Sequence, residues 1–354
     1  MKKLLLLFFS LMFYVNGWGQ DPSFSQIDNT LVYYHSSYMP IKGGVNVSGV
    51  YRNQWSEVPG GFTTQFLHVD IKPAKKNTGF GLNICNDIEG AAFIKTQRAD
   101  LIVRQKCPIR YKIKKKELVS LTFGGYVGVQ RKSLDWSKLV FSDEIDPVFG
   151  IYQNSSQLTP TILNSLFYDC GISVSGEFKF KLNEYRIPLD LHASLNHFLS
   201  RGWESLQGLD TRLPRLFVIT AATTIQKNSF YNIPLIKPTI QYEKQSTIHR
   251  IKCGSLVGYL DDRNDRSFYL GMYYSSFINT RYRGNAYSII PAVGYEKVVN
   301  DFLIGVAYSH DMNLSGVNFS NVGPVHEITF AINAVTGDKK YKSKSNIFKK
   351  CADF

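Results

Sequence analysis

The sequence lacks the features of a metal site or a disulfide scaffold. Its five cysteines form no CxxC pair and stand far apart, at Cys85, Cys107, Cys170, Cys253 and Cys351. This spacing argues against the common zinc motifs and against a dense disulfide framework. Because their number is odd, at least one thiol has no partner within the chain, and one unassigned disulfide stays open. We expect neither a metal nor a cofactor.

Catalytic signatures are also missing. There is no GxSxG, HExxH or Walker sequence, and no GxGxxG ahead of a helix. A barrel enzyme with Ser and His near its rim is left open, but no spacing supports it. The formal net charge is +13, yet no aromatic–basic motif accompanies it, so nucleic acid is not an expected partner. The excess Lys and Arg instead suit lipid headgroups, acidic loops or the cell wall.

Long apolar runs are confined to the start of the chain. Two lysines precede an apolar stretch over 4–15, and Gly17 and Gly19 have the small size and spacing that signal peptidase requires. We therefore expect cleavage before Gln20, with an uncleaved anchor helix as the alternative. After residue 19 no run approaches the roughly 18 residues of a transmembrane helix. An exported chain without spanning helices is periplasmic, secreted, or an outer-membrane barrel.

What the chain does have is strict alternation of bulky residues with small or polar ones. In the segment 302–310 the bulky positions are Phe302, Ile304, Val306 and Tyr308. The same pattern returns over 326–334. A period of two predicts β-strands. The bulky face meets a second sheet in a soluble sandwich, or lipid in an outer-membrane barrel.

Fourteen such segments recur, an even number as a closed antiparallel barrel requires. They span 45–51, 63–71, 79–85, 96–111, 118–131, 169–182, 186–198, 216–227, 235–244, 249–260, 267–278, 286–299, 302–310 and 326–334. Aromatic residues make up 14% of the chain, while its mean hydropathy is only -0.15. In an outer-membrane barrel, aromatic girdles at the two interfaces raise the Tyr and Phe content, and polar residues facing the lumen lower the mean hydropathy. We predict an all-β fold, a single transmembrane antiparallel β-barrel, in preference to a soluble two-sheet protein.

The predicted organisation has four parts. Residues 1–19 are the signal peptide, 20–44 an N-terminal segment, 45–335 the barrel and 336–354 a basic tail. Whether the N-terminal segment extends into the periplasm or plugs the lumen is left open. The tail is either solvated or meets an acidic partner. A loop over 137–161 interrupts the strands, and glycines recurring on one strand face leave space inside a curved sheet.

Arg52 and Trp55 stand out as a candidate pair. Their odd separation on a strand predicts opposite faces. Trp55 would anchor at the lipid interface, while Arg52 would face the lumen and pair with an acid such as Glu327 or Asp70. We interpret this pair as structural, with ligand binding as the alternative.

Three other polar groups carry weaker signals. His192 and His197 are five residues apart, which predicts opposite strand faces and no shared metal. The turn 261–266 is rich in acids, but it lacks the central Gly and terminal Glu of an EF-hand. The acidic cluster in the 137–161 loop is interpreted as solvated, with cation or adhesin binding as the alternative. Its members are Asp143, Glu144 and Asp146.

Several motifs resemble those of one protein family. The DPxFSQ pattern is formed by Asp21, Pro22, Phe24, Ser25 and Gln26. An RxQW pattern follows at Arg52, Gln54 and Trp55, with PGGF at 59–62. Near the end stand GVAYSHD, containing Tyr308 and Asp311, and an HEI sequence that begins at His326 and Glu327. The chain closes on 351–354, where Ala352 replaces the proline of a CPxF pattern. As a set, these stretches resemble the PorP/SprF outer-membrane proteins of type IX secretion and gliding systems in Bacteroidetes.

The resemblance implies a barrel without catalytic activity that anchors or helps to export a secreted surface protein. Such partners include gliding adhesins with a type-B sorting domain. On the periplasmic side it implies a peptidoglycan-binding or OmpA-like protein. A channel or transporter for a small solute is the alternative, and a barrel enzyme the third hypothesis.

Overall fold

The computed structural model describes most of the chain from Asp21 onward. The described residues are 21–38, 44–58, 60–73, 76–90, 94–113, 116–134, 140, 144–146, 148, 150–151, 164–182, 185–198, 203–204, 210–211, 213–227, 235–261, 266–279, 285–300, 302–314 and 323–334. The predicted signal peptide, the basic tail and Cys351 lie outside them. Within the described residues, no helix has the length and apolar character needed to span a membrane.

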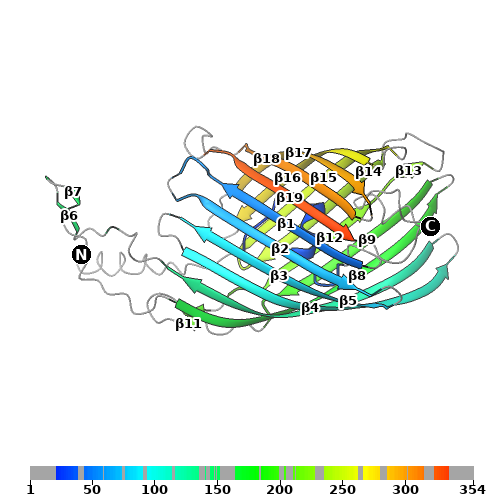
Figure 1. The fold of residues 1–354 in the computed structure, drawn as a ribbon, viewed down its shortest axis with the longest axis horizontal. Coiled ribbons are helices and arrows are strands. Elements are labelled where there is room, and N and C mark those ends of the chain that lie inside the picture. Colours follow the sequence, from blue (N-terminus) through cyan, green and yellow to red (C-terminus); the bar gives the residue numbers. More distant parts are fainter. Residues whose placement is uncertain are drawn as a thin grey trace, which may run out of the picture.

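The strands form one closed antiparallel barrel (Figure 1). They are β1 (Gly44–Gln54), β2 (Phe62–Lys72), β3 (Thr78–Glu89), β4 (Ile94–Ile113), β5 (Lys116–Ser133), β8 (Asn164–Leu182), β9 (Tyr185–Asn196), β12 (Leu216–Thr223), β13 (Gln226–Lys227), β14 (Leu235–Gln245), β15 (Ile248–Asp261), β16 (Arg266–Asn279), β17 (Asn285–Val299), β18 (Phe302–Asn313) and β19 (Val325–Ala334). Both β12 and β13 pair with β9, so these two make one interrupted strand and the barrel has 14. The predicted fold class is confirmed.

Closure joins the two ends of the described chain. β1 pairs with β19 along ten residue pairs, from Val45 opposite Ala334 to Gln54 opposite Val325. On the far side β12 pairs with both β9 and β14, so the sheet returns on itself. Two short hairpins lie outside the barrel wall: β6 (Ile145–Asp146) with β7 (Gly150–Ile151), and β10 (Trp203–Glu204) with β11 (Asp210–Thr211).

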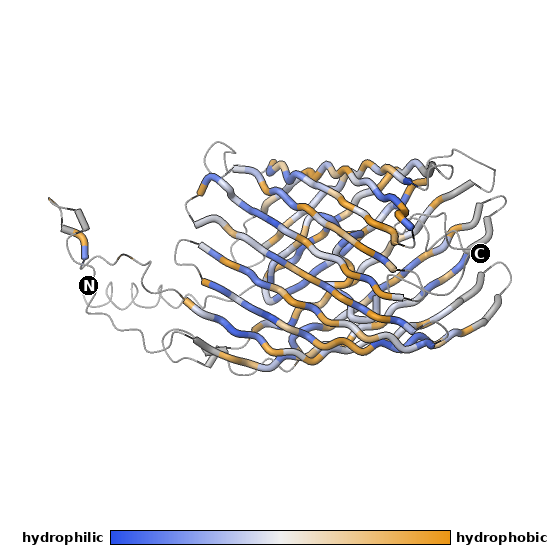
Figure 2. The backbone as a smooth tube through the Cα atoms, viewed as in Figure 1, coloured by the Kyte–Doolittle hydropathy of each residue, from blue (hydrophilic) through white to orange (hydrophobic). Residues whose placement is uncertain are grey.

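The alternation in sequence becomes an apolar outside and a polar inside (Figure 2). On β18, Phe302, Ile304, Val306 and Tyr308 point outward and are exposed, whereas Leu303, Ala307 and Ser309 are buried inside. An apolar outer band is the surface that a membrane's hydrocarbon core requires. Because the sheet is closed, the backbone N–H and C=O groups of each wall strand find their hydrogen-bond partners in the adjacent strands.

The two barrel ends differ in their connections. One end, which we call the long-loop end, carries the long connections 55–61, 134–163, 197–215 and 314–324 and the shorter 90–93, 246–247 and 280–284. The other, which we call the short-turn end, carries 73–77, 114–115, 183–184, 262–265 and 300–301 and one longer connection, 224–234, which includes β13; β1 begins and β19 ends there. Transmembrane barrels place short turns in the periplasm and long loops outside the cell.

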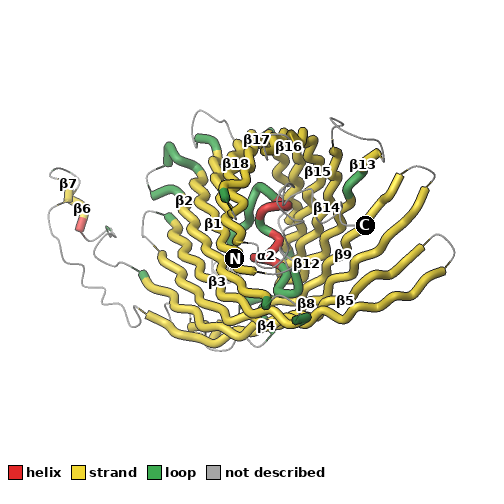
Figure 3. Tube along the Cα trace, turned by 45° about the vertical axis from the view of Figure 1, so that its right-hand side comes forward, coloured by secondary structure: helices red, strands yellow, loops and turns green. Residues whose placement is uncertain are grey.

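Residues 21–38 lie inside the barrel, and we call this segment the plug (Figure 3). It contains the turn η1 (Ile27–Asn29) and the short helix α2 (Leu31–Tyr34). Its start lines a cavity at the long-loop end, while Tyr38 lines a smaller one at the short-turn end. The plug therefore runs the length of the lumen before β1 begins.

Candidate functional site

The N-terminal motif of the plug is held by the last strand of the barrel. Glu327 on β19 is completely buried, and its carboxylate accepts hydrogen bonds from the backbone N–H groups of Ser25 (2.7 Å) and Gln26 (2.9 Å). The Gln26 side chain donates in return to the carbonyl of Glu327 at 3.2 Å. A carboxylate that accepts two adjacent backbone N–H groups fixes the course of that backbone.

Arg52 on β1 completes this contact. Its guanidinium lies 3.3 Å from the carboxylate of Glu327 and 3.5 Å from that of Asp311 on β18, and it also donates to Ser25 Oγ. Ser25 Oγ donates to Asp311 at 2.8 Å. Arg52 and Glu327 are direct partners in the β1–β19 register. One buried cation thus links the barrel's closing seam to the plug.

A second contact holds the first described residue. The His197 ring bonds Asp21 through Nε2 (2.5 Å) and Asp169 on β8 through Nδ1 (2.7 Å). Gln245 on β14 accepts from the Asp21 backbone N–H and donates to its carboxylate, each at 3.0 Å. Although burial lowers the pKa of His197, the charge of Asp21 and hydrogen bonds to both carboxylates outweigh it and raise that pKa to about 9.

This contact predicts a pH dependence. Because the pKa of His197 rises from 6.5 to about 9, its stabilisation is fully present below pH 6.5 and is lost as pH rises through 9. Burial opposes ionisation of Asp21, but the positive charge of His197 outweighs this and lowers the pKa of the Asp21 carboxyl. The stabilisation that the Asp21 carboxylate provides is therefore lost only in acid. We expect the free energy of unfolding to fall by roughly 3 kcal/mol between pH 6 and 10. Urea titrations of the folded barrel measure this.

His197→Gln is the matched variant for that titration, since it keeps a hydrogen-bonding side chain but removes the titrating ring. Its stability should vary much less over the same range. Equal slopes for the two proteins would show that His197 carries no charge-dependent contact.

Two cations on β15 lie beside the start of the plug. Lys252 is 2% exposed, donates to the carbonyl of Phe24 at 2.7 Å and pairs with Glu243 on β14 at 2.7 Å. Arg250 also pairs with Glu243, at 2.8 Å. Glu243 therefore serves two cations, one of which holds the plug.

The middle of the plug is fixed by another buried ion pair. Asp28, in η1, lies 2.8 Å from Lys237 on β14 and accepts hydrogen bonds from Tyr273 (2.7 Å) and Thr239 (3.0 Å). All four residues are buried. Buried charges persist when they are paired and hydrogen-bonded, as here.

Apolar packing supports these polar contacts. Phe24 packs edge-on against Tyr33 (ring centroids 4.8 Å apart), and Tyr33 packs edge-on against Phe66 on β2 (5.2 Å). Ile27 and Leu31 are buried against another part of the wall, which is formed by the five strands from β14 to β18. The plug is thus packed like a protein core and is not a loose tether.

The end of the plug lies close to the wall. Ser36 and Ser37 hydrogen-bond to Ser173 and Ser175 on β8. A Cβ built at Gly124 on β5 would stand 2.5 Å from the carbonyl carbon of Ser36. Only glycine leaves room for the plug backbone here.

We expect Gly124→Leu to displace the end of the plug. The leucine side chain would occupy the space now filled by the backbone of Ser36 and Ser37, and that backbone cannot rotate away as a flexible side chain could. Hydrogen–deuterium exchange over 31–38 should rise at least tenfold while the strands stay protected. Gly125→Leu is the control, since a Cβ at Gly125 meets only one carbonyl, at 3.5 Å. Equal exchange in both variants would contradict the close fit.

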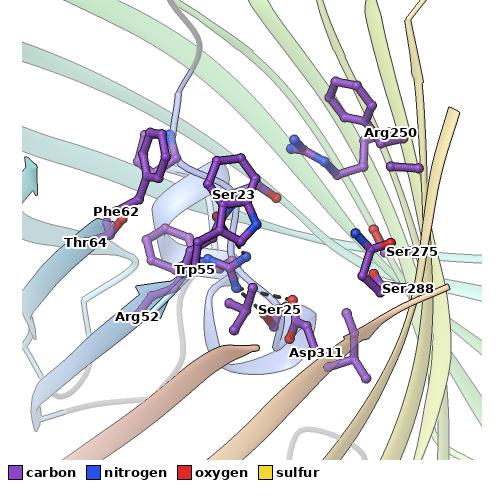
Figure 4. Close-up of a pocket in the computed structure, with 18 of the residues that line it drawn as sticks. Ser23, Ser25, Arg52, Trp55, Phe62, Thr64, Arg250, Ser275, Ser288 and Asp311 are labelled. Atoms are coloured by element: carbon purple, nitrogen blue, oxygen red, sulfur yellow. Dashed lines mark hydrogen bonds and ion pairs between the residues drawn. The ribbon is translucent and has the colours of Figure 1, made fainter. Parts of the chain in front are cut away.

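The cavity at the long-loop end, which we call the vestibule, has a volume of about 590 Å³ (Figure 4). Its floor is the start of the plug, from Asp21 to Ser25. Its walls carry Arg250, Ser275 and Ser288 on one side and aromatic residues on the other. The cavity at the short-turn end is far smaller, about 70 Å³.

Trp55 departs from the sequence-based prediction. Strand β1 ends at Gln54 and Trp55 has a positive φ of 59°, so strand alternation no longer sets its direction. It lines the vestibule beside Phe62, with ring centroids 4.9 Å apart. The prediction that Arg52 and Trp55 face opposite sides is therefore wrong.

His197 departs for the same reason. Strand β9 ends at Asn196, and His197 has a φ of 62°. Both His192 and His197 are buried inside the barrel, so their predicted placement on opposite faces is wrong. They bind different partners: His192 is bonded to Ser175, and no cluster of three metal-ligating side chains occurs in the described part of the chain.

The structure separates the other predicted residues into two groups. Pro22 and Gln54 line the vestibule with Asp21 and Phe24. Tyr308 and His326 instead lie on the outer face, joined by a hydrogen bond of 2.7 Å. Of the two acids predicted to pair with Arg52, Glu327 does so in the structure.

The remaining predictions have mixed outcomes. Asp70 lies near Arg104 and bonds Asn46, away from Arg52. Glu144 is buried, whereas Asp143 and the centre of the 261–266 turn lie outside the described residues. The four described cysteines are all thiols.

Sequence reasoning missed His197, Lys252 and Lys237 as plug contacts, and Asp169 as the partner of His197. Each of the last three sits on the small or polar face of a predicted strand, which marks it as facing the lumen. Nothing in the spacing indicates which of many inward polar residues meets the plug.

Comparison with known proteins gives one family match and several similar solved structures. A family model described as "Type IX secretion system membrane protein PorP/SprF" matches residues 16–332. Similar solved structures include a bacterial polysaccharide outer membrane secretin (9% identity, TM-score 0.38, covering 83% of this chain and 99% of that one). Another is a Pseudomonas aeruginosa FadL homologue (10% identity, TM-score 0.41, covering 86% and 93%). A third is the CymD monoaromatic hydrocarbon channel (10% identity, TM-score 0.42, covering 87% and 93%). No curated protein sequence matches the chain.

Proposed function

Because the chain belongs to the PorP/SprF family of type IX secretion system membrane proteins, we propose that this outer-membrane barrel is a non-catalytic anchor for a secreted surface protein. The proposed partner is an adhesin with a type-B sorting domain, held at the long-loop end. The observation that carries the proposal is the plug. A segment held by buried charges along its length suits a fixed support better than a passage for solutes.

The orientation of the barrel supports this role. Its short turns and the start of β1 lie at one end, which the general rule for outer-membrane barrels assigns to the periplasm. The vestibule then opens toward the cell exterior, where a secreted protein would be held. On the periplasmic side we propose a peptidoglycan-binding or OmpA-like partner.

A non-catalytic role also fits the contact between Ser175 and His192 in the lumen. Ser175 lies 2.6 Å from His192, but both are buried and Ser175 also bonds Ser37 of the plug. A nucleophile must reach its substrate, and here the plug covers it. Ser175→Ala should therefore leave the anchoring role intact.

Affinity isolation of the detergent-solubilised protein, followed by mass spectrometry, tests the proposal. We expect a large secreted protein to co-purify, and the same protein to appear in the medium of a deletion strain. A channel would instead conduct ions in planar bilayers without any change to its plug. Steady conductance of the unaltered protein, with no secreted partner recovered, would overturn the anchor in favour of a small-solute channel.

A further inference from the structure

The outer wall carries a group of four hydrogen-bonding side chains where β4 and β5 lie side by side (Figure 1). Lys95 on β4 is directly opposite Ser133 on β5 in the strand register. One step along the same face, Gln97 is directly opposite Arg131. That face is the outer one, because Leu101, an even number of residues farther along β4, is strongly exposed to the outside. All four side chains are exposed or half-buried, and we call them the outer quartet.

The spacing within the outer quartet suits one small anion. Residues directly opposite each other on antiparallel strands have Cβ atoms about 5 Å apart. Residues two apart along one strand are separated by about 7 Å. The long side chains of Lys95 and Arg131 occupy diagonal corners and can therefore converge on one group above the quartet. An ammonium, a guanidinium, an amide and a hydroxyl together are a donor set for a phosphate, which carries negative charge and several acceptor oxygens.

The charges in this part of the wall are sorted by face. Asp100 on β4 is buried inside the barrel, and Asp87 and Glu89 on β3 line the vestibule. The outer face shows the opposite pattern. On each of the 14 strands, the two outward positions nearest the long-loop end that the structure describes include no Asp or Glu. An anion that approaches these positions from outside therefore meets only neutral or positive side chains.

The outer quartet lies at the edge of the apolar outer band. The next outward pair along the two strands is Ala99 opposite Val129. The pair after it, Leu101 opposite Val127, is strongly exposed. A ligand with a phosphate on the quartet can therefore extend hydrocarbon over these residues, toward the centre of the membrane. An amphipathic molecule with a phosphorylated head matches both parts of this surface, whereas free phosphate matches only the quartet.

We propose that the outer quartet binds the phosphate of a lipid headgroup in the outer leaflet of the membrane. The quartet is at the long-loop end, which transmembrane barrels turn to the cell exterior. Lys95 and Arg131 bind the phosphate oxygens, the amide and the hydroxyl of the quartet add neutral hydrogen bonds, and acyl chains lie over Leu101 and Val127. This inference goes beyond the anchoring function and does not depend on it, because it concerns a surface that faces lipid.

Native mass spectrometry of the detergent-solubilised protein tests this with lipid A and with the same lipid after enzymatic removal of its phosphates. We expect lipid A to bind about 10- to 100-fold more tightly, since the dephosphorylated form lacks the charge-assisted hydrogen bonds. Inorganic phosphate at the same concentration should not displace lipid A, because it makes no contact with the apolar band. Equal binding of the two lipid forms would overturn the proposal. Displacement by inorganic phosphate would assign the quartet to free anions and overturn it as well.

Variants locate the contact. The double variant Lys95→Gln/Arg131→Gln should bind both lipid forms alike, and it should still fold, because both side chains face outward; migration on a gel with and without heating checks this. Lys244→Gln is the matched control, since Lys244 is an exposed cation at the same end, on β14 between Phe217 and His249. The control should keep the preference for lipid A. A double variant that kept it too would overturn the proposal, and so would an equal loss in both variants, because general positive charge would then attract the lipid.

Discussion

A variant lacking residues 23–38 is expected to conduct ions in planar bilayers, whereas the full-length barrel is expected to stay closed. The plug fills the lumen from the vestibule to the short-turn end, and a barrel of this size without its contents is wide enough for water. Barrels of about eight strands are filled by their own side chains, and those of about 16 leave an aqueous channel. With 14 strands, the emptied barrel approaches the second case.

The deletion leaves the wall able to fold, since every strand keeps its neighbours. Migration on a gel with and without heating checks that the barrel is intact before conductance is measured. The full-length protein and Gly125→Leu serve as closed controls, and Gly124→Leu should show intermediate, flickering conductance. An intact deletion variant that stays silent would mean that the loops, and not the plug, close the lumen.

The second large effect is expected from Arg52→Met. This substitution leaves the buried carboxylates of Glu327 and Asp311 without their cation, a loss that costs about 3–5 kcal/mol in buried pairs. Exchange of the Ser25 and Gln26 amides, which bond Glu327, should therefore accelerate by roughly 100- to 5000-fold. Hydrogen–deuterium exchange resolved to the peptide covering 23–30 measures it.

Arg52→Lys and the double variant Arg52→Met/Glu327→Gln sharpen the comparison. Lys keeps the charge but loses the fork that reaches two carboxylates, so its effect should be smaller. Removing both charges should restore part of the lost stability, because no unpaired carboxylate is left at Glu327. If the double variant were no better than Arg52→Met alone, the ion pair would not be what holds the seam to the plug.

The barrel itself was predictable because its signal is repeated. All fourteen alternating segments became strands of the wall, and the register of each is set by which residues can face lipid. A period of two reports local geometry, and it holds as long as the strand lasts. Trp55 and His197 fall one residue beyond a strand end, and there the alternation stops carrying information.

The plug was not predictable by the same means. Polar and apolar residues follow no regular period in the plug. Its contacts join residues more than 150 positions apart in the chain, as Asp21 and His197 are. What the sequence did contain was a set of polar motifs at both ends of the chain. The structure brings Ser25, Arg52, Asp311 and Glu327 together, which no spacing along the chain could indicate.

The meeting of first and last segments has a consequence for biogenesis. Residues that leave the export machinery first are bound by carboxylates on the two strands that leave it last. The site for Ser25 and Gln26 does not exist until β18 and β19 have arrived beside β1. Zipping of that seam and seating of Ser25 and Gln26 are therefore one concluding step, whereas the contacts of Asp28 with β14 and of Ser37 with β8 can form before it.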